Sequence, residues 1–321
     1  MLLEKNKKER KMNNTAETKG FYEYRTTLRA MSDGVSLLTK NATMLLKATW
    51  PFLLIVSLIG AWFCLSVTGV ASSLLIDSSS ELDWGVLVMR FVVPGVFLAA
   101  GMLAFYAMVY TLFSKYIEKG FMPSITRKRF QIGPRITKLP RLLIGVLWAL
   151  FVIGVYLALA VVLVSLSEWT LVLLVPCYVV LVFWLFNQIT GYVLISDTLM
   201  GSIRHSWGIT VKGFGSFITV SVVLALILGV VGLISLLPSL CSNIIYVKAQ
   251  MSLAEGDGGD LPNYFMPVYF LAVTVSVFLM LLLEAIGVSC WSMVYGAVDT
   301  RLKLKKAEKS QKSIVEVPGN S

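Results

Sequence analysis

Long apolar stretches alternate with short polar segments along most of the chain. Six apolar runs lie near residues 49–76, 85–114, 142–166, 169–195, 214–240 and 264–297. A helix needs about 20 residues to cross the hydrocarbon core of a bilayer, and every run reaches that length. The pattern therefore predicts an all-α, polytopic integral membrane protein with six transmembrane helices. The longer runs predict tilt, or extension past the membrane interface.

A second pattern, with helical periodicity, occupies residues 197–213 and continues into the fifth run. Its apolar residues recur every three or four positions and form one stripe: Met200, Ile203, Trp207, Val211 and Phe214. Such spacing predicts an amphipathic helix. Polar residues are predicted on its other face: Arg204, His205 and Lys212. This arrangement is typical of a helix that lies flat at a membrane surface.

Residues 21–47 show the same periodicity, with a stripe of Leu28, Met31, Val35, Leu38, Ala42 and Leu45. We therefore expect two amphipathic interfacial helices, each directly before a span. A shift of 172 positions brings three short pieces, Ala30-Met31, Gly34-Val35 and Lys40-Asn41, onto Ser202-Ile203, Ser206-Trp207 and Lys212-Gly213. The match reflects either an internal duplication, which would be parallel, or only the shared helical period.

The charged residues predict the orientation in the membrane. The chain is 57% hydrophobic and 14% charged, with a net charge of +10 that could suggest nucleic acid. However, 26 of the 28 basic residues lie in the N-terminal region, the second and fourth connecting segments and the C-terminal tail. The intervening loops are acidic or nearly uncharged. By the positive-inside rule the basic side, with both termini and both amphipathic helices, is cytoplasmic, and nucleic acid is not an expected partner.

The chain ends and connecting segments predict no folded domain outside the membrane. We expect disordered cytoplasmic tails at residues 1–20 and 304–321 around a membrane domain at 21–303, and either Met1 or Met12 as the first residue. The basic segment 126–141 either lies along anionic headgroups or only sets topology. The acidic loop at 255–260 lacks the ligand spacing of a calcium site.

Ionisable residues inside apolar runs are costly, so each is a candidate site. Arg90 lies near the predicted outer end of the second run, within reach of the interface by snorkelling. Glu284 lies deep in the last run. We hypothesise a polar cluster of Glu284 with Asn187 or Gln188 that binds a proton or a substrate. The alternative is interhelical hydrogen bonding that only holds the spans together.

The sequence offers no catalytic, metal or cofactor site. His205 is the single histidine, so a Ser/His/Asp triad away from its helix is excluded, and headgroup contact is the expected role of this residue. The four cysteines contain no CxxC pair and are read as small packing residues.

Several short pieces resemble the bacterial membrane domain fused to some glycerophosphoryl diester phosphodiesterases, and the related YciC-like membrane proteins. The pieces are Asp197, Ser202-Ile203, Ser206-Trp207, Thr210 and Gly213, together with Ala30 to Asn41 and with Tyr295, Asp299 and Arg301. The resemblance extends from about Thr27 to Lys303. It implies a six-span domain of the bacterial cytoplasmic membrane, close to lipid or envelope metabolism. The phosphodiesterase activity does not carry over, because no His/Glu/Asp cluster lies outside the membrane.

Together these features predict a non-enzymatic membrane protein that binds anionic lipid headgroups, or a protein partner, at the inner leaflet. A small transporter or permease subunit that uses Glu284 is the second hypothesis. A membrane-embedded enzyme of lipid metabolism is the third.

Overall fold

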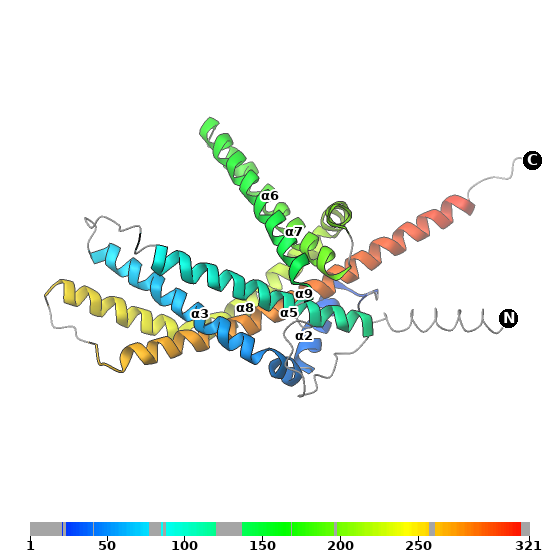
Figure 1. Ribbon diagram of the computed structural model, residues 1–321. Helices are drawn as coiled ribbons and strands as arrows, with labels where there is room; N and C mark the ends of the chain where they lie inside the picture. The colour runs from blue at the N-terminus through cyan, green and yellow to red at the C-terminus, as the bar shows by residue number, and fades with distance from the viewer. Residues whose placement is uncertain are drawn as a thin grey trace, which may run out of the picture. The chain divides into compact units, whose positions relative to one another are not determined.

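Every element of the computed structural model is a helix within the residues it describes, which are 21, 24–40, 42–76, 85, 88–119, 137–167, 169–195, 198–256 and 261–315. The elements are α2 (Thr27–Lys40), α3 (Ala42–Ile76), η1 (Val88–Val92), α5 (Val93–Lys119), α6 (Leu139–Leu166), α7 (Thr170–Leu194), α8 (Leu199–Ala254) and α9 (Phe265–Val315) (Figure 1). The predicted all-α class is confirmed.

Within the part of the chain that the structure describes, six segments are long and apolar enough to cross a membrane. They are Thr49–Ala71, Val88–Glu118, Leu139–Ser165, Val172–Leu194, Leu199–Ala254 and Phe265–Glu308. Their number and order match the six apolar runs of the sequence. The chain therefore has the architecture of a multi-pass membrane protein.

The chain divides into two compact units. The first unit comprises Met1–Ala42, Ala107–Val223 and Val288–Ser321, and the second comprises Thr43–Tyr106 and Leu224–Gly287. Helices α5, α8 and α9 each pass from one unit to the other. The amphipathic segments and the basic end of α9 thus belong to the first unit, whereas Glu284 belongs to the second.

Two helices are longer than the sequence predicts. Residues 199–213 of the predicted interfacial helix and the predicted span 214–240 lie in a single helix of 56 residues, α8. At 1.5 Å per residue it is about 80 Å long, far more than a bilayer core. Ending a helix inside an apolar segment would leave backbone groups unpaired, and neither Gly213 nor Gly215 stops it. Helix α9 likewise continues to Val315, because the basic segment after Arg301 is rich in helix-forming Lys, Ala and Leu.

The first predicted amphipathic helix is shorter than expected. Residues 27–40 form α2, and the residues from Ala42 onward already belong to α3. The predicted apolar stripe does not all face the same surroundings, because Met31 and Leu38 are buried whereas Leu28 is 59% exposed. The buried face also contains Ala30 and Gly34, so α2 packs into the first unit through small residues as well as apolar ones.

Arg90 lies in η1, a short π-helical turn directly before α5. Pro94 follows, and a proline ring clashes with the carbonyl of the residue four positions earlier, which here is Arg90. A widened π turn relieves that clash and explains where this irregularity falls. The Arg90 side chain is exposed; its predicted place at the outer interface stays a prediction.

The core of the first unit is the stretch of α9 from Ser292 to Asp299, in which every residue is buried. Glycines bring neighbouring helices close to it. A Cβ added to Gly191 would lie 2.5 Å from Tyr295 Oη, and one added to Gly213 would lie 2.6 Å from Val298 Cγ1. Small residues that permit close helix approach are the usual means of association in membranes.

In the second unit, parts of α3, α5, α8 and α9 run alongside one another (Figure 1). Gly60 contacts Val277, and Gly101 contacts Val56. A polar cluster joins three of these helices, because Thr68 Oγ1 donates to Asn243 Oδ1 at 3.0 Å and Tyr269 Oη donates to the same oxygen. No pattern in the sequence predicted this cluster.

Several predictions concern residues outside those described. These are the tails at 1–20 and 316–321, the acidic loop at 77–83, most of the basic segment 126–141, Asp197, and residues 257–260 of the fifth loop.

Candidate functional site

The first turns of α8 present two contrasting faces. Met200, Trp207 and Val211 are 72%, 52% and 53% exposed. Their spacings of seven and four residues place them on one side of the helix. The opposite side is small and polar and is buried, with Ser202 and Ser206 at 1% and 0% exposure. The apolar stripe of the sequence therefore faces outward at these three positions, while small hydroxyl residues form the packing face.

Arg204, His205 and Lys212 were predicted to share the face of this helix opposite the apolar stripe, and this is only partly correct. Arg204 is exposed and follows Met200 by four residues, so it lies beside the apolar stripe and not opposite it. His205 and Lys212 lie seven residues apart on the flank that faces α9, where both line a cavity. The basic residues of α8 therefore point in two directions.

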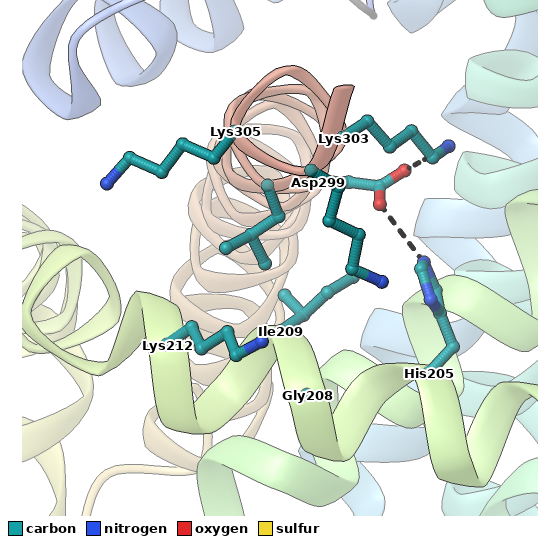
Figure 2. Close-up of a pocket in the computed structure, with 9 residues that line it drawn as sticks. His205, Gly208, Ile209, Lys212, Asp299, Lys303 and Lys305 are labelled. Carbon is teal, nitrogen blue, oxygen red and sulfur yellow. Dashed lines mark ion pairs between the residues drawn. The ribbon is translucent and has the colours of Figure 1, made fainter. Parts of the chain in front are cut away.

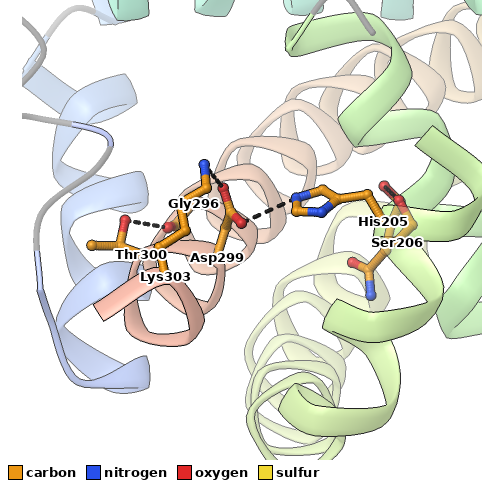
Figure 3. Close-up of polar contacts among 7 residues, drawn as sticks. His205, Ser206, Gly296, Asp299, Thr300 and Lys303 are labelled. Atoms are coloured by element: carbon orange, nitrogen blue, oxygen red, sulfur yellow. Dashed lines mark hydrogen bonds and ion pairs between the residues drawn. The ribbon is translucent and has the colours of Figure 1, made fainter. Parts of the chain in front are cut away.

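His205 forms an ion-pair contact with a buried carboxylate of α9. Its Nε2 lies 3.1 Å from Asp299 Oδ1, and Lys303 Nζ lies 2.7 Å from Asp299 Oδ2 (Figure 3). The Asp299 side chain is 1% exposed. A buried carboxylate is tolerated only when it is paired, so these two groups explain how an aspartate can end the most buried stretch of the first unit.

A cavity of about 410 Å³ opens beside this pair, between α8 and α9. Six of its lining residues are ionisable: His205, Lys212, Asp299, Lys303, Lys305 and Lys306. Figure 2 shows His205 and Asp299 pointing toward each other and Lys305 extending away from them. Four of these six are lysines and one is a carboxylate, and Ile209 and Leu302 provide an apolar part of the wall.

Asn187 of α7 is the centre of a buried hydrogen-bond network. Its Nδ2 donates to Thr210 Oγ1 at 2.9 Å, and its Oδ1 accepts from Trp291 Nε1 at 3.0 Å. Ser206 Oγ donates to the Asn187 carbonyl at 3.2 Å. The network thus fastens α7 to the first turns of α8 and to α9.

Gln188 is equally buried but has a different environment. Both atoms of its side-chain amide lack a hydrogen-bond partner among the described residues, while its backbone carbonyl accepts from Ser202 Oγ at 3.1 Å.

Glu284 has its own partner in the second unit. Tyr106 Oη donates to Glu284 Oε2 at 2.5 Å. Asn187 and Gln188 belong to the first unit, so the hypothesised cluster of Glu284 with either residue joins the two units and stays a prediction. The observed hydrogen bonds provide a local partner for Glu284 and for Asn187, and none for the Gln188 amide.

The positions matched by the 172-residue shift have similar environments. Ala30 and Gly34 of α2 are buried, as are Ser202 and Ser206 of α8. A Cβ on Gly34 would lie 2.8 Å from Cys290 Cα, so the α2 backbone contacts α9 directly. Both segments therefore use small residues four positions apart as a packing face, which is consistent with a duplication and equally with helical period.

Three residues of the family resemblance lie close together in the second half of α9. Tyr295 packs against Gly191, and Asp299 pairs with His205. Arg301 Nη2 donates to Thr27 Oγ1 at 3.3 Å, and Thr27 Oγ1 donates to Ser216 Oγ at 3.0 Å. Arg301 thereby connects the beginning of α2 to α8. These residues hold the first unit together.

The partners of the candidate residues were only partly visible in the sequence. The Asp299–Lys303 spacing of four residues was a visible signal for an ion pair on a helix. Nothing in the sequence indicated that His205 would lie beside them, because the two segments are separated by more than ninety positions. Tyr106 was likewise hidden in an apolar run.

In the described residues, no three His, Cys, Asp or Glu side chains are grouped as metal ligands.

Comparison of the chain with protein-family models, with curated proteins and with solved structures finds no match.

Proposed function

We propose that the protein is a non-enzymatic component of the bacterial cytoplasmic membrane that binds anionic lipid headgroups at the inner leaflet, with both termini in the cytoplasm. The observation that supports this most is the outward apolar stripe of α8 beside exposed Arg204 and the lysine-lined cavity. Apolar groups that enter the acyl region, flanked by cations at headgroup level, are the features of an interfacial helix. We also propose that the chain is related to the YciC-like membrane proteins that it resembles in sequence. A place close to lipid or envelope metabolism, which that resemblance implies, agrees with this role.

The first test is lipid retention. The protein purified in mild detergent should keep phosphatidylglycerol in preference to phosphatidylcholine, as measured by native mass spectrometry. Each basic residue near a membrane surface contributes about 1 kcal/mol toward anionic lipid, so a preference of at least about tenfold is expected. Equal retention of the two lipids would contradict the proposed function.

A matched pair of variants tests the stripe itself. Met200→Glu with Val211→Glu places two charges on the exposed apolar side without disturbing a buried contact. Accumulation in the membrane fraction and retention of anionic lipid should both fall. The control, Met200→Leu with Val211→Leu, should retain both properties. Normal accumulation and retention in the glutamate variant would exclude the stripe from lipid binding.

The second candidate function is a small transporter or permease subunit, which the contact between Tyr106 and Glu284 favours. A carboxyl group in an apolar helix is held as the protonated acid or by hydrogen bonds. Helix α9 carries Glu284 far from both of its ends. A carboxyl that gains and loses a proton at such a position is the element that proton-coupled transport requires.

Glu284 should react with dicyclohexylcarbodiimide, which modifies protonated carboxyls in apolar surroundings. Peptide mass spectrometry should find the adduct at Glu284 and not at exposed Glu255, and Glu284→Gln should remove it. The glutamine still accepts the Tyr106 hydrogen bond, so abundance should be nearly unchanged. Absence of the adduct in the unmodified protein would contradict a proton-binding role, and loss of the Gln variant from the membrane would indicate a structural one.

A further inference from the structure

We infer that the cavity between α8 and α9 is a binding site for a phosphate group, with preference for a phosphomonoester. This inference rests on the proposed function, and it names the chemical group that the inner-leaflet site recognises.

The charge of the cavity is the first argument. Lys303 lies 2.7 Å from buried Asp299, so this carboxylate is compensated within the wall. Two further lysines of the lining, Lys212 and Lys305, give the cavity its positive excess. A dianion compensates that excess better than a monoanion. Lysines are well suited to phosphate, since each offers three donors on a flexible stem.

The shape of the cavity is the second argument. Its volume of about 410 Å³ falls within the range of small-molecule sites, about 300–1,000 Å³. Gly208 provides a stretch of wall without a side chain, with no atom within 4 Å of where its Cβ would be. Ile209 and Leu302 add apolar surface. A polar headgroup whose first carbons follow it into the cavity would meet both kinds of wall.

The His205–Asp299 contact is the third argument. It holds the α8 wall against the α9 wall from within the cavity lining (Figures 2 and 3). His205 is 38% exposed whereas Asp299 is 1% exposed. The imidazole therefore presents an edge to the cavity while the carboxylate, which would repel an anion, is withdrawn behind its partners. Lys303 is 60% exposed, so a negatively charged ligand meets this lysine before the carboxylate.

The same phosphate group could come from a lipid headgroup or from a soluble compound, and the experiment separates these sources. Native mass spectrometry in mild detergent would measure binding of phosphatidic acid and of phosphatidylglycerol, and a thermal-shift titration would measure binding of inorganic phosphate. The variant is Lys212→Gln with Lys305→Gln. The controls are Lys212→Arg with Lys305→Arg, which keeps the charge, and Lys248→Gln, which removes one lysine charge elsewhere on α8 outside the cavity lining.

We expect phosphatidic acid to bind more tightly than phosphatidylglycerol. The glutamine variant should bind phosphatidic acid about tenfold more weakly or worse, because each lost hydrogen bond to a charged group lowers the binding free energy. Both controls should bind as the unmodified protein does, and added salt should weaken binding. Lysine-dependent binding of phosphatidic acid alone supports a lipid headgroup, and a lysine-dependent shift with phosphate alone supports a soluble ligand.

Two outcomes overturn the inference. If the glutamine variant, eluting as the unmodified protein does in size-exclusion chromatography, keeps full affinity for every probe, the cavity is not the site. If phosphatidylglycerol binds as tightly as phosphatidic acid, the monoester preference is wrong. If the glutamine variant still prefers anionic lipids, the proposed function stands although the cavity is not the site. If inorganic phosphate shifts the thermal midpoint but the protein shows no preference among lipids, the proposed function is wrong and the cavity remains a phosphate site.

Discussion

Replacing Gly34 by alanine is expected to destabilise the protein by about 1–3 kcal/mol, the usual cost of overpacking a close contact. The added Cβ would lie 2.8 Å from Cys290 Cα, 3.0 Å from Cys290 N and 3.2 Å from Ser289 O. These are backbone atoms of a helix and cannot move aside as a flexible side chain can. Within a helix, alanine usually stabilises the fold by about 0.5–1 kcal/mol relative to glycine. At position 34 the cost of the steric clash is therefore larger than this gain in helix propensity.

Gly215→Ala is the matched control. Gly215 is also helical, but no atom lies within 4 Å of its Cβ position. It should be neutral or slightly stabilising, so the two alanine variants should shift the thermal midpoint in detergent in opposite directions. Modification of Cys290 by a maleimide gives a second measurement, in a background where Cys64, Cys177 and Cys241 are serine. Cys290 is 0% exposed and should react faster when α2 is displaced. A stable, unreactive Gly34→Ala protein would contradict the packing of α2 on α9.

Replacing Asn187 by leucine is the second change with a large expected effect. The leucine removes the acceptor of Trp291 Nε1 and the donor to Thr210 Oγ1. A buried donor left without a partner costs about 1–3 kcal/mol. The variant should therefore lose several degrees of thermal midpoint, together with much of the connection between α7, α8 and α9.

The neighbouring residue is the control for this prediction. Gln188→Met has similar length and equal burial, but it removes an amide whose two polar atoms have no partner among the described residues. Replacing such a group by an apolar one of similar shape is nearly neutral or stabilising. Opposite effects at two adjacent, fully buried positions would show that hydrogen bonding, and not volume, is the cause. Equal losses in both variants would exclude that explanation.

The helices of this protein were largely predictable because their signal is local. Each apolar run exceeds about 20 residues, and the six candidate membrane-crossing helices match them. The helix ends were less predictable. The change in hydropathy between residues 197–213 and 214–240 predicted two separate segments, yet α8 continues unbroken from Leu199 to Ala254. A change of polarity does not end a helix unless a breaker or a cap is present.

The candidate site was predictable only in its parts. His205 and Lys212 were identified on their helix, and Asp299 was noted near the end of the last run, but no local pattern joined them. The stripe of α8 was also identified, although its buried counterpart, Ser202, Ser206 and Thr210, was not. Hydroxyl residues carry no hydrophobic signal, so their use as a packing face appears only when the neighbouring helices are in place.

The sequence by itself determined the number of apolar helices, their order and the asymmetric distribution of basic residues, since each depends on composition within a single segment. Only the tertiary structure decided that Asp299 pairs with His205, that Asn187 joins three helices, and that Tyr106 is the partner of Glu284. The physical reason is that side-chain pairing depends on which helix faces meet. Apolar helices can meet in many registers of similar hydrophobicity, so the small residues and hydrogen bonds that select one register act only in the packed state.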